Sequence, residues 1–294
     1  MDFPYKNATL GDGLRIAYID EQPPPKGETK GVIVLIHGFP QTSYQFRKVI
    51  QPLVSAGYRV IAPDYRGAGL SSKPPTTDFR KTTMANDILL LLDHLSITEP
   101  VHVVGHDIGG MLSHALATRH PARVASLVWG ECPLPGTRAH LEDRTTRAAQ
   151  QFHFIFHCVP DLPEALVSGR EEAYLNHFFD GLSHRRDAIS REDVGWYVDM
   201  YRRPGALRCA FAVYAAFAKD AEENEAWVRE KGKCAVRTLG VSGGESRHRL
   251  DAAEMFGEVH REGTFRVVEV AESGHYVAEE NPEGFVKVVL EFIE

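Results

Sequence analysis

Short, mostly apolar runs alternate with amphipathic stretches along much of the 294-residue chain. Runs of this kind are typical of strands that are covered on both faces, as in parallel sheets. They lie at 32–36, 59–62, 101–104, 124–129, 236–241 and 265–270. Helices are expected between them, at 44–55, 83–95, 110–119 and 282–293, the last beginning with Pro282 after Asn281 as its N-cap. This alternation predicts a wound α/β sheet.

The alternation stops between residues 134 and 232, where the sequence contains no good strand run. This stretch predicts several helices interrupted by prolines and glycines. A helical block inside a regular β/α series is best explained as an inserted lid. We therefore expect a core formed by 1–133 and 233–294 and a helical cap formed by 134–232. An ordinary extension of the main helical layer is the alternative.

Charge and composition argue against some classes of function. The net charge of −7 gives no electrostatic reason to bind nucleic acid or an anionic membrane. The longest apolar runs, such as 88–92, are too short to cross a bilayer, and the first six residues lack the pattern of a signal peptide. The four cysteines are widely spaced, which favours reduced thiols. We expect a cytoplasmic protein, and the sequence leaves a homodimer open.

One motif carries candidate chemistry: Gly105-His106-Asp107-Ile108-Gly109, between an apolar run and an apolar helix. It has the form Gly-x-nucleophile-x-Gly, a sharp strand-to-helix turn that projects its central side chain from the edge of the sheet. Small residues two positions before and after the centre avoid a collision. The motif predicts that Asp107 is a nucleophile. The alternative is a turn in which this aspartate only caps the following helix.

Three further motifs accompany it: His37-Gly38-Phe39-Pro40, Asp64-Tyr65-Arg66-Gly67-Ala68-Gly69-Leu70-Ser71, and Ser273-Gly274-His275. In this order, the four motifs resemble those of the epoxide hydrolase and haloalkane/haloacetate dehalogenase branch of the α/β-hydrolases. The resemblance implies a mostly parallel sheet of about eight strands with a helical cap. It also implies hydrolysis through an ester on Asp107, without a metal or an organic cofactor. The backbone amides of Phe39 and Ile108 would form the oxyanion hole.

The chemistry of a carboxylate nucleophile supports this interpretation independently. Attack by a carboxylate on a carboxylic ester would give an anhydride, which is a poor intermediate. Attack on a saturated carbon gives an ordinary ester, so Asp107 suits an epoxide or an alkyl halide. Water must then attack the carbonyl carbon of that ester. His275 is expected to be the base for this water, because it lies in the Ser-Gly-His loop after the run at 265–270.

The acid that would orient His275 has more than one candidate. Many relatives carry it after the strand that here ends at Val241, but Ser246 stands where their aspartate is expected, and Glu245 is the nearest acid. Some relatives instead carry it after the sixth strand, where this sequence has Glu131. We expect Glu131 to be the acid, with Glu245 as the second candidate and Asp251 as a more distant third.

The residues beside the nucleophile favour an epoxide over a halide. Haloalkane dehalogenases typically carry Trp where Ile108 stands, and many carry Asn where Phe39 stands. Haloacetate dehalogenases carry Arg at the positions of Ile108 and Met111, to hold the substrate carboxylate. Both halide interpretations therefore lack expected partners.

An epoxide oxygen needs proton donors from the cap, and His153 and Tyr214 resemble the two donor positions. Tyr174, Tyr197 and Tyr201 are the substitutes, and packing in the core is the alternative role for each of these residues. The leading hypothesis is an epoxide hydrolase that uses a small apolar epoxide and water to form a vicinal diol. A dehalogenase with the same Asp107 and His275, and a non-catalytic ligand-binding relative, are the alternatives.

Overall fold

The computed structural model describes residues 3–11, 13–24, 29–76 and 78–294. Residues 1–2, on which part of the expectation about a signal peptide rests, lie outside the described residues. The described strands form one eight-stranded sheet in the order β1-β2-β4-β3-β5-β6-β7-β8. They are β1 Lys6–Thr9, β2 Arg15–Glu21, β3 Gly31–Ile36, β4 Tyr58–Pro63, β5 Val101–His106, β6 Val124–Gly130, β7 Thr238–Gly243 and β8 Phe265–Val270.

Strands β3 to β8 run parallel, whereas β1 and β2 pair in the antiparallel direction at one side of the sheet. The predicted α/β-hydrolase fold, with its mostly parallel sheet, is therefore confirmed. The strand expected at 236–241 begins two residues later, at Thr238. The Thr238 hydroxyl donates a hydrogen bond of 2.8 Å to the Val236 carbonyl, which marks a local turn ahead of the strand.

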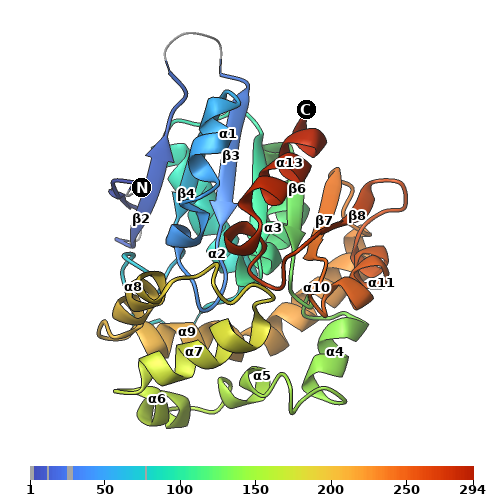
Figure 1. Ribbon diagram of the computed structural model, residues 1–294. Helices are drawn as coiled ribbons and strands as arrows, with labels where there is room; N and C mark the ends of the chain where they lie inside the picture. The colour runs from blue at the N-terminus through green and yellow to red at the C-terminus, as the bar shows by residue number, and fades with distance from the viewer. Residues whose placement is uncertain (1–2, 12, 25–28, 77) are drawn as a thin grey trace.

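Helices cover both faces of the sheet (Figure 1). One apolar layer includes side chains of α2 Lys81–His94, α3 Ile108–Arg119 and α11 Arg249–Val259, and the other includes side chains of α1 Ile50–Ser55 and α13 Pro282–Ile293. Short elements complete the core, namely η1 Ser43–Phe46, η2 Pro121–Arg123 and α12 Val277–Glu280.

One of the expected helices has the predicted bounds, and another is divided into two elements. The last helix has the predicted bounds, and the Asn281 side chain accepts a hydrogen bond of 2.9 Å from the Gly284 amide, as expected for an N-cap. The helix expected at 44–55 is wrong as one element, because it divides into η1 and α1. Pro52 explains the division, since a proline fits the first turn of a helix but clashes with the carbonyl four residues earlier in a helix interior.

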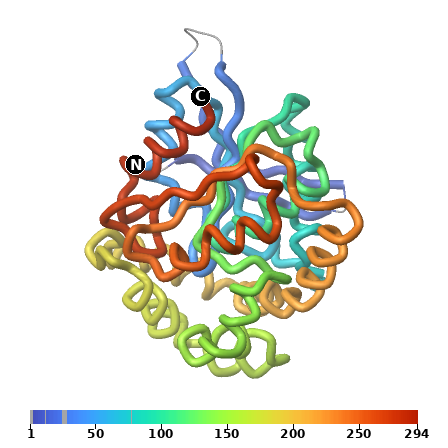
Figure 2. The backbone as a smooth tube through the Cα atoms, turned by 90° about the vertical axis from the view of Figure 1, so that its right-hand side faces the viewer, coloured from blue at the N-terminus to red at the C-terminus, as the bar shows by residue number. Residues whose placement is uncertain are grey.

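A helical block, residues 138–231, follows β6 and precedes β7 in the chain. It lies across one end of the strands (Figures 1 and 2). Phe39, which follows β3, packs its ring against Phe178, Tyr201 and Tyr214 of this block. The block therefore covers the carboxyl ends of the central strands. It contains α4 Arg138–Arg144, α5 His153–Phe156, α6 Leu162–Val167, α7 Glu171–Leu182, α8 Arg191–Tyr201, α9 Ala206–Ala215 and α10 Phe217–Lys231.

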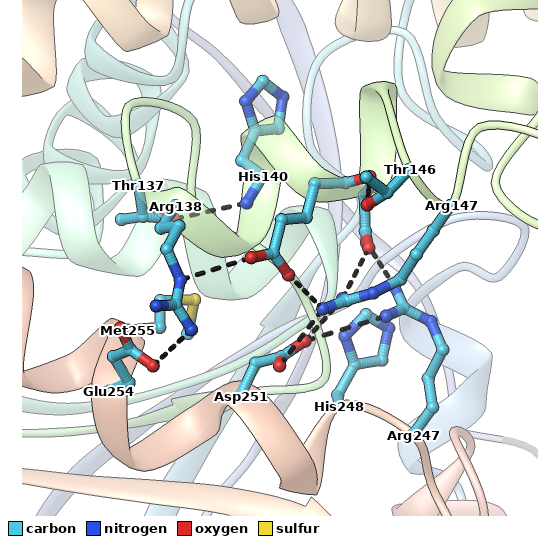
Figure 3. Close-up of polar contacts among 12 residues, drawn as sticks. Thr137, Arg138, His140, Thr146, Arg147, Arg247, His248, Asp251, Glu254 and Met255 are labelled. Atoms are coloured by element: carbon cyan, nitrogen blue, oxygen red, sulfur yellow. Dashed lines mark hydrogen bonds and ion pairs between the residues drawn. The ribbon is translucent and has the colours of Figure 1, made fainter.

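Ion pairs fasten the start of the block to the core (Figure 3). Arg147, just after α4, bonds both Asp143 of α4 and Asp251 of α11, at 3.0 and 2.5 Å. Arg247, just before α11, also pairs with Asp143. The Asp143 side chain has no exposed surface, so both arginines compensate a charge that would be costly to bury alone.

The end of the block is held in the same way. Lys81, at the start of α2, pairs with Asp220 of α10 at 2.8 Å, and both side chains are at most 4% exposed. Its ammonium also donates to the carbonyl of Val213, one residue before Tyr214. The core therefore positions the α9 segment that carries Tyr214.

The four cysteines agree with the expectation of reduced thiols. Cys132, Cys158, Cys209 and Cys234 are all free, and three of them are buried. Across the described residues, no helix combines the length and the apolar character that a bilayer crossing requires.

Candidate active site

Asp107 stands between β5 and α3 in a backbone conformation that is rare for a residue with a side chain. Its φ and ψ are 54° and −122°. The flanking glycines make this turn feasible. A Cβ added to Gly105 would lie 2.3 Å from the Gly109 carbonyl oxygen, and one added to Gly109 would lie 2.1 Å from the Ile36 carbonyl oxygen. The strand, the turn and the helix thus pack too closely for larger residues, as the motif predicts.

The Asp107 carboxylate rests against two backbone amides. The Phe39 amide donates a hydrogen bond of 2.8 Å to Oδ1, and the Ile108 amide also bonds the carboxylate. Burial raises the pKa of Asp107 above its usual range, whereas His275 and these two amides oppose the rise. The predicted nucleophile and the two predicted amide donors therefore meet in the structure.

Glu131 and His275 form a buried pair beside this carboxylate. His275 Nδ1 lies 3.0 Å from Glu131 Oε2, and the two side chains are 6% and 1% exposed. The Glu131 carboxylate also accepts hydrogen bonds from the Gly243 amide at 2.9 Å and from the Ser246 hydroxyl at 2.7 Å. With a third bond from His275, the buried carboxylate is well compensated.

The other two candidate acids lie elsewhere. Glu245 is exposed, and Asp251 is engaged by Arg147. Of the three acids that the sequence offered, Glu131 alone is hydrogen-bonded to His275 in the described structure.

The loop that carries His275 is held by Glu280, whose carboxylate accepts hydrogen bonds from the amides of Gly274 and Tyr276, each at 3.0 Å. Burial alone would lower the pKa of His275, but the hydrogen bond and charge of Glu131, together with the charges of Asp107 and Glu280, raise it above its ordinary value. The imidazole therefore keeps a proton readily while Asp107 carries its charge.

His153 and Tyr214 lie together on the other side of the site. Their rings are 5.5 Å apart, and the Tyr214 ring packs at the same distance from that of Phe39, whose amide bonds Asp107. Burial and then the Asp107 charge raise the pKa of Tyr214 well above its ordinary value. Burial, followed by the charge of His275, lowers the pKa of His153 to about 3. Both predicted donors thus lie near the predicted nucleophile and base.

The substitute tyrosines are placed differently from one another. Tyr201 packs edge-on against Phe39, and burial followed by the Asp107 charge raises its pKa. The Tyr174 hydroxyl lies 2.6 Å from His157 Nε2, and the Tyr197 hydroxyl donates to Glu279 at 2.8 Å. Tyr201 is therefore the substitute that shares the surroundings of Tyr214, whereas the other two hydroxyls are already bonded.

Three residues make contacts in the site that were not predicted from the sequence. His106 Nε2 lies 2.7 Å from the His275 carbonyl oxygen. Ser246 bonds Glu131 from the position where an aspartate was expected. The ring of His157 lies 4.5 Å from that of Tyr214 and one helical turn from His153. Only His157 had a usable signal, since its i+4 spacing from His153 places both on one face.

Replacing Ser246 with Ala is expected to lower kcat about tenfold, because Glu131 loses a charged hydrogen bond of about 1.5–3 kcal/mol and holds His275 less firmly. Ser246→Thr keeps a hydroxyl and should recover most of the loss. Steady-state kinetics should show the change in kcat rather than in KM. Equal kcat values for Ser246→Ala and the wild type would contradict a positioning role for this hydroxyl.

One group of residues has the composition of a metal site. Ligand atoms of Glu131, His248 and His275 lie within 4.8 Å of one another. His248 is partly buried on the loop before α11, and its ring centroid is 5.8 Å from that of His275.

Comparison with known proteins agrees with the fold. Residues 31–148 match the model of a family described as the alpha/beta hydrolase fold. A "Soluble epoxide hydrolase" of Corynebacterium sp. (strain C12) is 33% identical over 264 residues, which are 88% of this chain and 89% of that protein.

Two further proteins are similar over different lengths. The "AB hydrolase superfamily protein YfhM" of Bacillus subtilis (strain 168) is 36% identical over 194 residues, which are 64% of this chain and 66% of that protein. The solved structure "Epoxide hydrolase CorEH without ligand" has a TM-score of 0.86 and 29% identity, with 99% of this chain and 98% of that chain covered.

Proposed function

Because this chain belongs to the α/β-hydrolase family, in the branch that contains epoxide hydrolases, we propose that it opens an epoxide to a vicinal diol through an ester on Asp107. The observation that carries the proposal is a carboxylate at the elbow, between two backbone amides and a His275–Glu131 pair. A carboxylate in this place can form a stable ester only with a saturated carbon.

The first step is alkylation of Asp107. An oxygen of its carboxylate attacks one ring carbon of the epoxide, the bond from that carbon to the ring oxygen breaks, and the ring oxygen takes up the electron pair. Tyr214 gives this oxygen its proton, because it is buried close enough to Asp107 for that charge to raise its pKa. His153 stabilises the same oxygen through an N–H hydrogen bond. With a pKa of about 3, it is neutral near pH 7 and is not the acid.

The second step is hydrolysis of the ester. His275 takes a proton from water, and the resulting hydroxide attacks the carbonyl carbon of Asp107. The amides of Phe39 and Ile108 hold the developing oxyanion, in the place where they already bond the free carboxylate. The bond between this carbon and the ester oxygen then breaks, the leaving oxygen takes the proton of the added hydroxyl, and the diol leaves while Asp107 becomes a carboxylate again. The proton on His275 then returns to the Tyr214 oxygen, which restores both groups for the next turnover.

Alkylation of Asp107 also changes the pKa of the base, His275. The Asp107 charge contributes to the raised pKa of His275, and esterification removes that charge. The pKa of His275 is therefore lower in the ester than in the free enzyme, so the imidazole loses its proton at the stage where it must accept one from water.

Ester hydrolysis is therefore expected to slow as the pH falls through the pKa of His275, because only the neutral imidazole can act as the base. Rapid-mixing single turnovers between about pH 5 and 9 should separate the two steps. Ester decay should rise with pH to a plateau, whereas alkylation should stay fast until Asp107 itself is protonated at a lower pH. A decay rate independent of pH over this range would contradict the role of His275.

Replacing Tyr214 with Phe is expected to lower the rate of alkylation about 100-fold, because the ring oxygen loses its proton donor. Tyr174→Phe is the matched control, since that hydroxyl is bonded to His157, and its effect should stay within a few-fold. Pre-steady-state kinetics with one epoxide measure both variants. A large loss in Tyr174→Phe and none in Tyr214→Phe would move the donor to Tyr174.

A substrate panel tests the proposed function itself. Aryl and alkyl epoxides should give vicinal diols, and haloalkanes and haloacetates should release no halide above the rate of the Asp107→Ala variant. Halide release without diol formation would identify the protein as a dehalogenase. No turnover and no covalent adduct with any of these electrophiles would favour a ligand-binding relative.

The proposal uses a small apolar epoxide and water, and its chemistry requires no metal or organic cofactor. We also propose that the enzyme is cytoplasmic and that residues 134–232 form the cap over Asp107. A homodimer stays a prediction, which sedimentation would test.

A further inference from the structure

His248 lies beside the His275–Glu131 pair but has no part in the reaction proposed above. Its ring centroid is 5.8 Å from that of His275, and its backbone amide donates to the Ser246 hydroxyl at 3.2 Å. Within the described part of the chain, no hydrogen bond engages the ring nitrogens of His248. The ring can therefore turn without losing a bond.

Glu131, His248 and His275 supply a carboxylate and two imidazoles, and their ligand atoms lie within 4.8 Å of one another. Two histidines and one glutamate are a protein ligand set of tetrahedral zinc sites, in which water takes the fourth position. Glu131 Oε2 and His275 Nδ1, 3.0 Å apart, are already close to the spacing of two ligands on one ion. A turn of His248 would bring in the third.

The surroundings of His248 suit a metal ligand. Its ring nitrogens have no hydrogen-bond partner among the described residues, so a lone pair is free to bind an ion. The two nearby arginines would oppose a cation, but both are paired: Arg147 and Arg247 each contact Asp143, and Arg147 also contacts Asp251 (Figure 3). The carboxylates offset this local positive charge.

We propose that Glu131, His248 and His275 form a binding site for a divalent transition-metal ion such as Zn²⁺, and that the bound ion inhibits the enzyme. Imidazole ligands select Zn²⁺ and similar ions over Mg²⁺ and Ca²⁺, which prefer oxygen ligands.

The inhibition rests on the proposed role of His275. A cation bound to Nδ1 and to Glu131 replaces the hydrogen bond between them and keeps the proton of the neutral ring on Nε2. The imidazole then cannot take a proton from water, whereas Asp107 can still attack a substrate. The metal therefore stops the second step and leaves the ester on Asp107.

Titration of the protein with Co²⁺ alone tests binding without any assay of activity. One equivalent should give the visible ligand-field absorption of a site with nitrogen ligands, and Zn²⁺ should displace it. His248→Asn is expected to weaken the affinity about 100-fold. His94→Asn, which changes an exposed histidine at the end of α2, is the matched control and should not alter it. Binding that is absent, or equal in His248→Asn and the wild type, would overturn the site.

Zn²⁺ should also inhibit diol formation reversibly, with chelator restoring the rate. Without metal, His248→Asn should turn over within about twofold of the wild type, and the same Zn²⁺ concentration should leave it active. Intact-protein mass in the presence of Zn²⁺ and epoxide should show the added mass of the ester in the wild type. Metal binding that depends on His248 but does not slow turnover would overturn the inhibitory role. An enzyme that forms no diol even without metal would instead count against the proposed function, and leave the binding result standing.

Discussion

The variant His275→Gln is expected to stop turnover while leaving Asp107 loaded with substrate. Alkylation needs the Asp107 carboxylate and a proton donor from the cap, so it should continue. Hydrolysis needs a base for water, and glutamine cannot supply one. We expect kcat to fall at least 1,000-fold, within the range of about 10²–10⁴ typical of general-base catalysis.

The intact mass of His275→Gln after exposure to an epoxide is the measurement. It should increase by the mass of one epoxide molecule, and digestion should place the addition on the peptide that contains Asp107. The double variant Asp107→Ala/His275→Gln is the control and should gain no mass. Loss of turnover in His275→Gln with no adduct would assign His275 to the first step, contrary to the mechanism proposed here.

The second large effect is expected at Glu131. In the variant Glu131→Gln, His275 loses the charge that stabilises its protonated form during hydrolysis, and its tautomer is no longer fixed by a carboxylate. Removing the corresponding charge from a serine protease triad costs about 10⁴-fold in kcat. A loss of about 10²–10⁴-fold is expected here, and the intermediate should again accumulate.

Glu245→Gln is the matched control for Glu131→Gln, because it makes the same change at an exposed acid on the loop after β7. Its kcat should stay within about twofold of the wild type. Thermal unfolding of both variants separates a catalytic loss from a folding defect, since a buried residue with three hydrogen-bond partners also supports the loop. A severe loss in Glu245→Gln with a normal Glu131→Gln would reverse the assignment of the acid.

The central strands of the fold could be predicted from the sequence because β3 to β6 are buried on both faces and so are continuous apolar runs. β1 gave no such signal, and β2 gave only a short apolar run at 16–19 that was not predicted as a strand. The four residues of β1 include one buried position, and β2 begins and ends with charged residues. β2 is placed by its pairing with β4, and β1 by its pairing with β2.

Some parts of the site could likewise be predicted from the sequence, and others could not. The elbow at Asp107 could be predicted because a sharp turn between a strand and a helix needs small residues at fixed spacing, and Gly105 and Gly109 record that need in the sequence. The contact between Glu131 and His275 joins residues 144 positions apart, and periodicity carries no information about it. The resemblance offered two places for the acid, and the structure shows which acid reaches the histidine.

The surroundings of the cap donors could not be predicted, because they depend on how seven helices pack. His153 and Tyr214 belong to α5 and α9, and their rings meet because both segments lie over Phe39. The neighbour His157 shares this environment, yet a histidine on an amphipathic helix is more often a packing residue, and the sequence alone does not separate the two roles.

Asp107 as the nucleophile is the central claim, and a single turnover in heavy-oxygen water tests it most directly. With enzyme in excess over an epoxide, the water oxygen should enter the Asp107 carboxylate, and the first diol released should carry the original carboxylate oxygen. Mass spectrometry of the peptide containing Asp107 should then show one heavy oxygen, while the diol shows none. Heavy oxygen in the diol, with an unlabelled Asp107, would mean that water attacks the epoxide directly and would contradict the covalent mechanism.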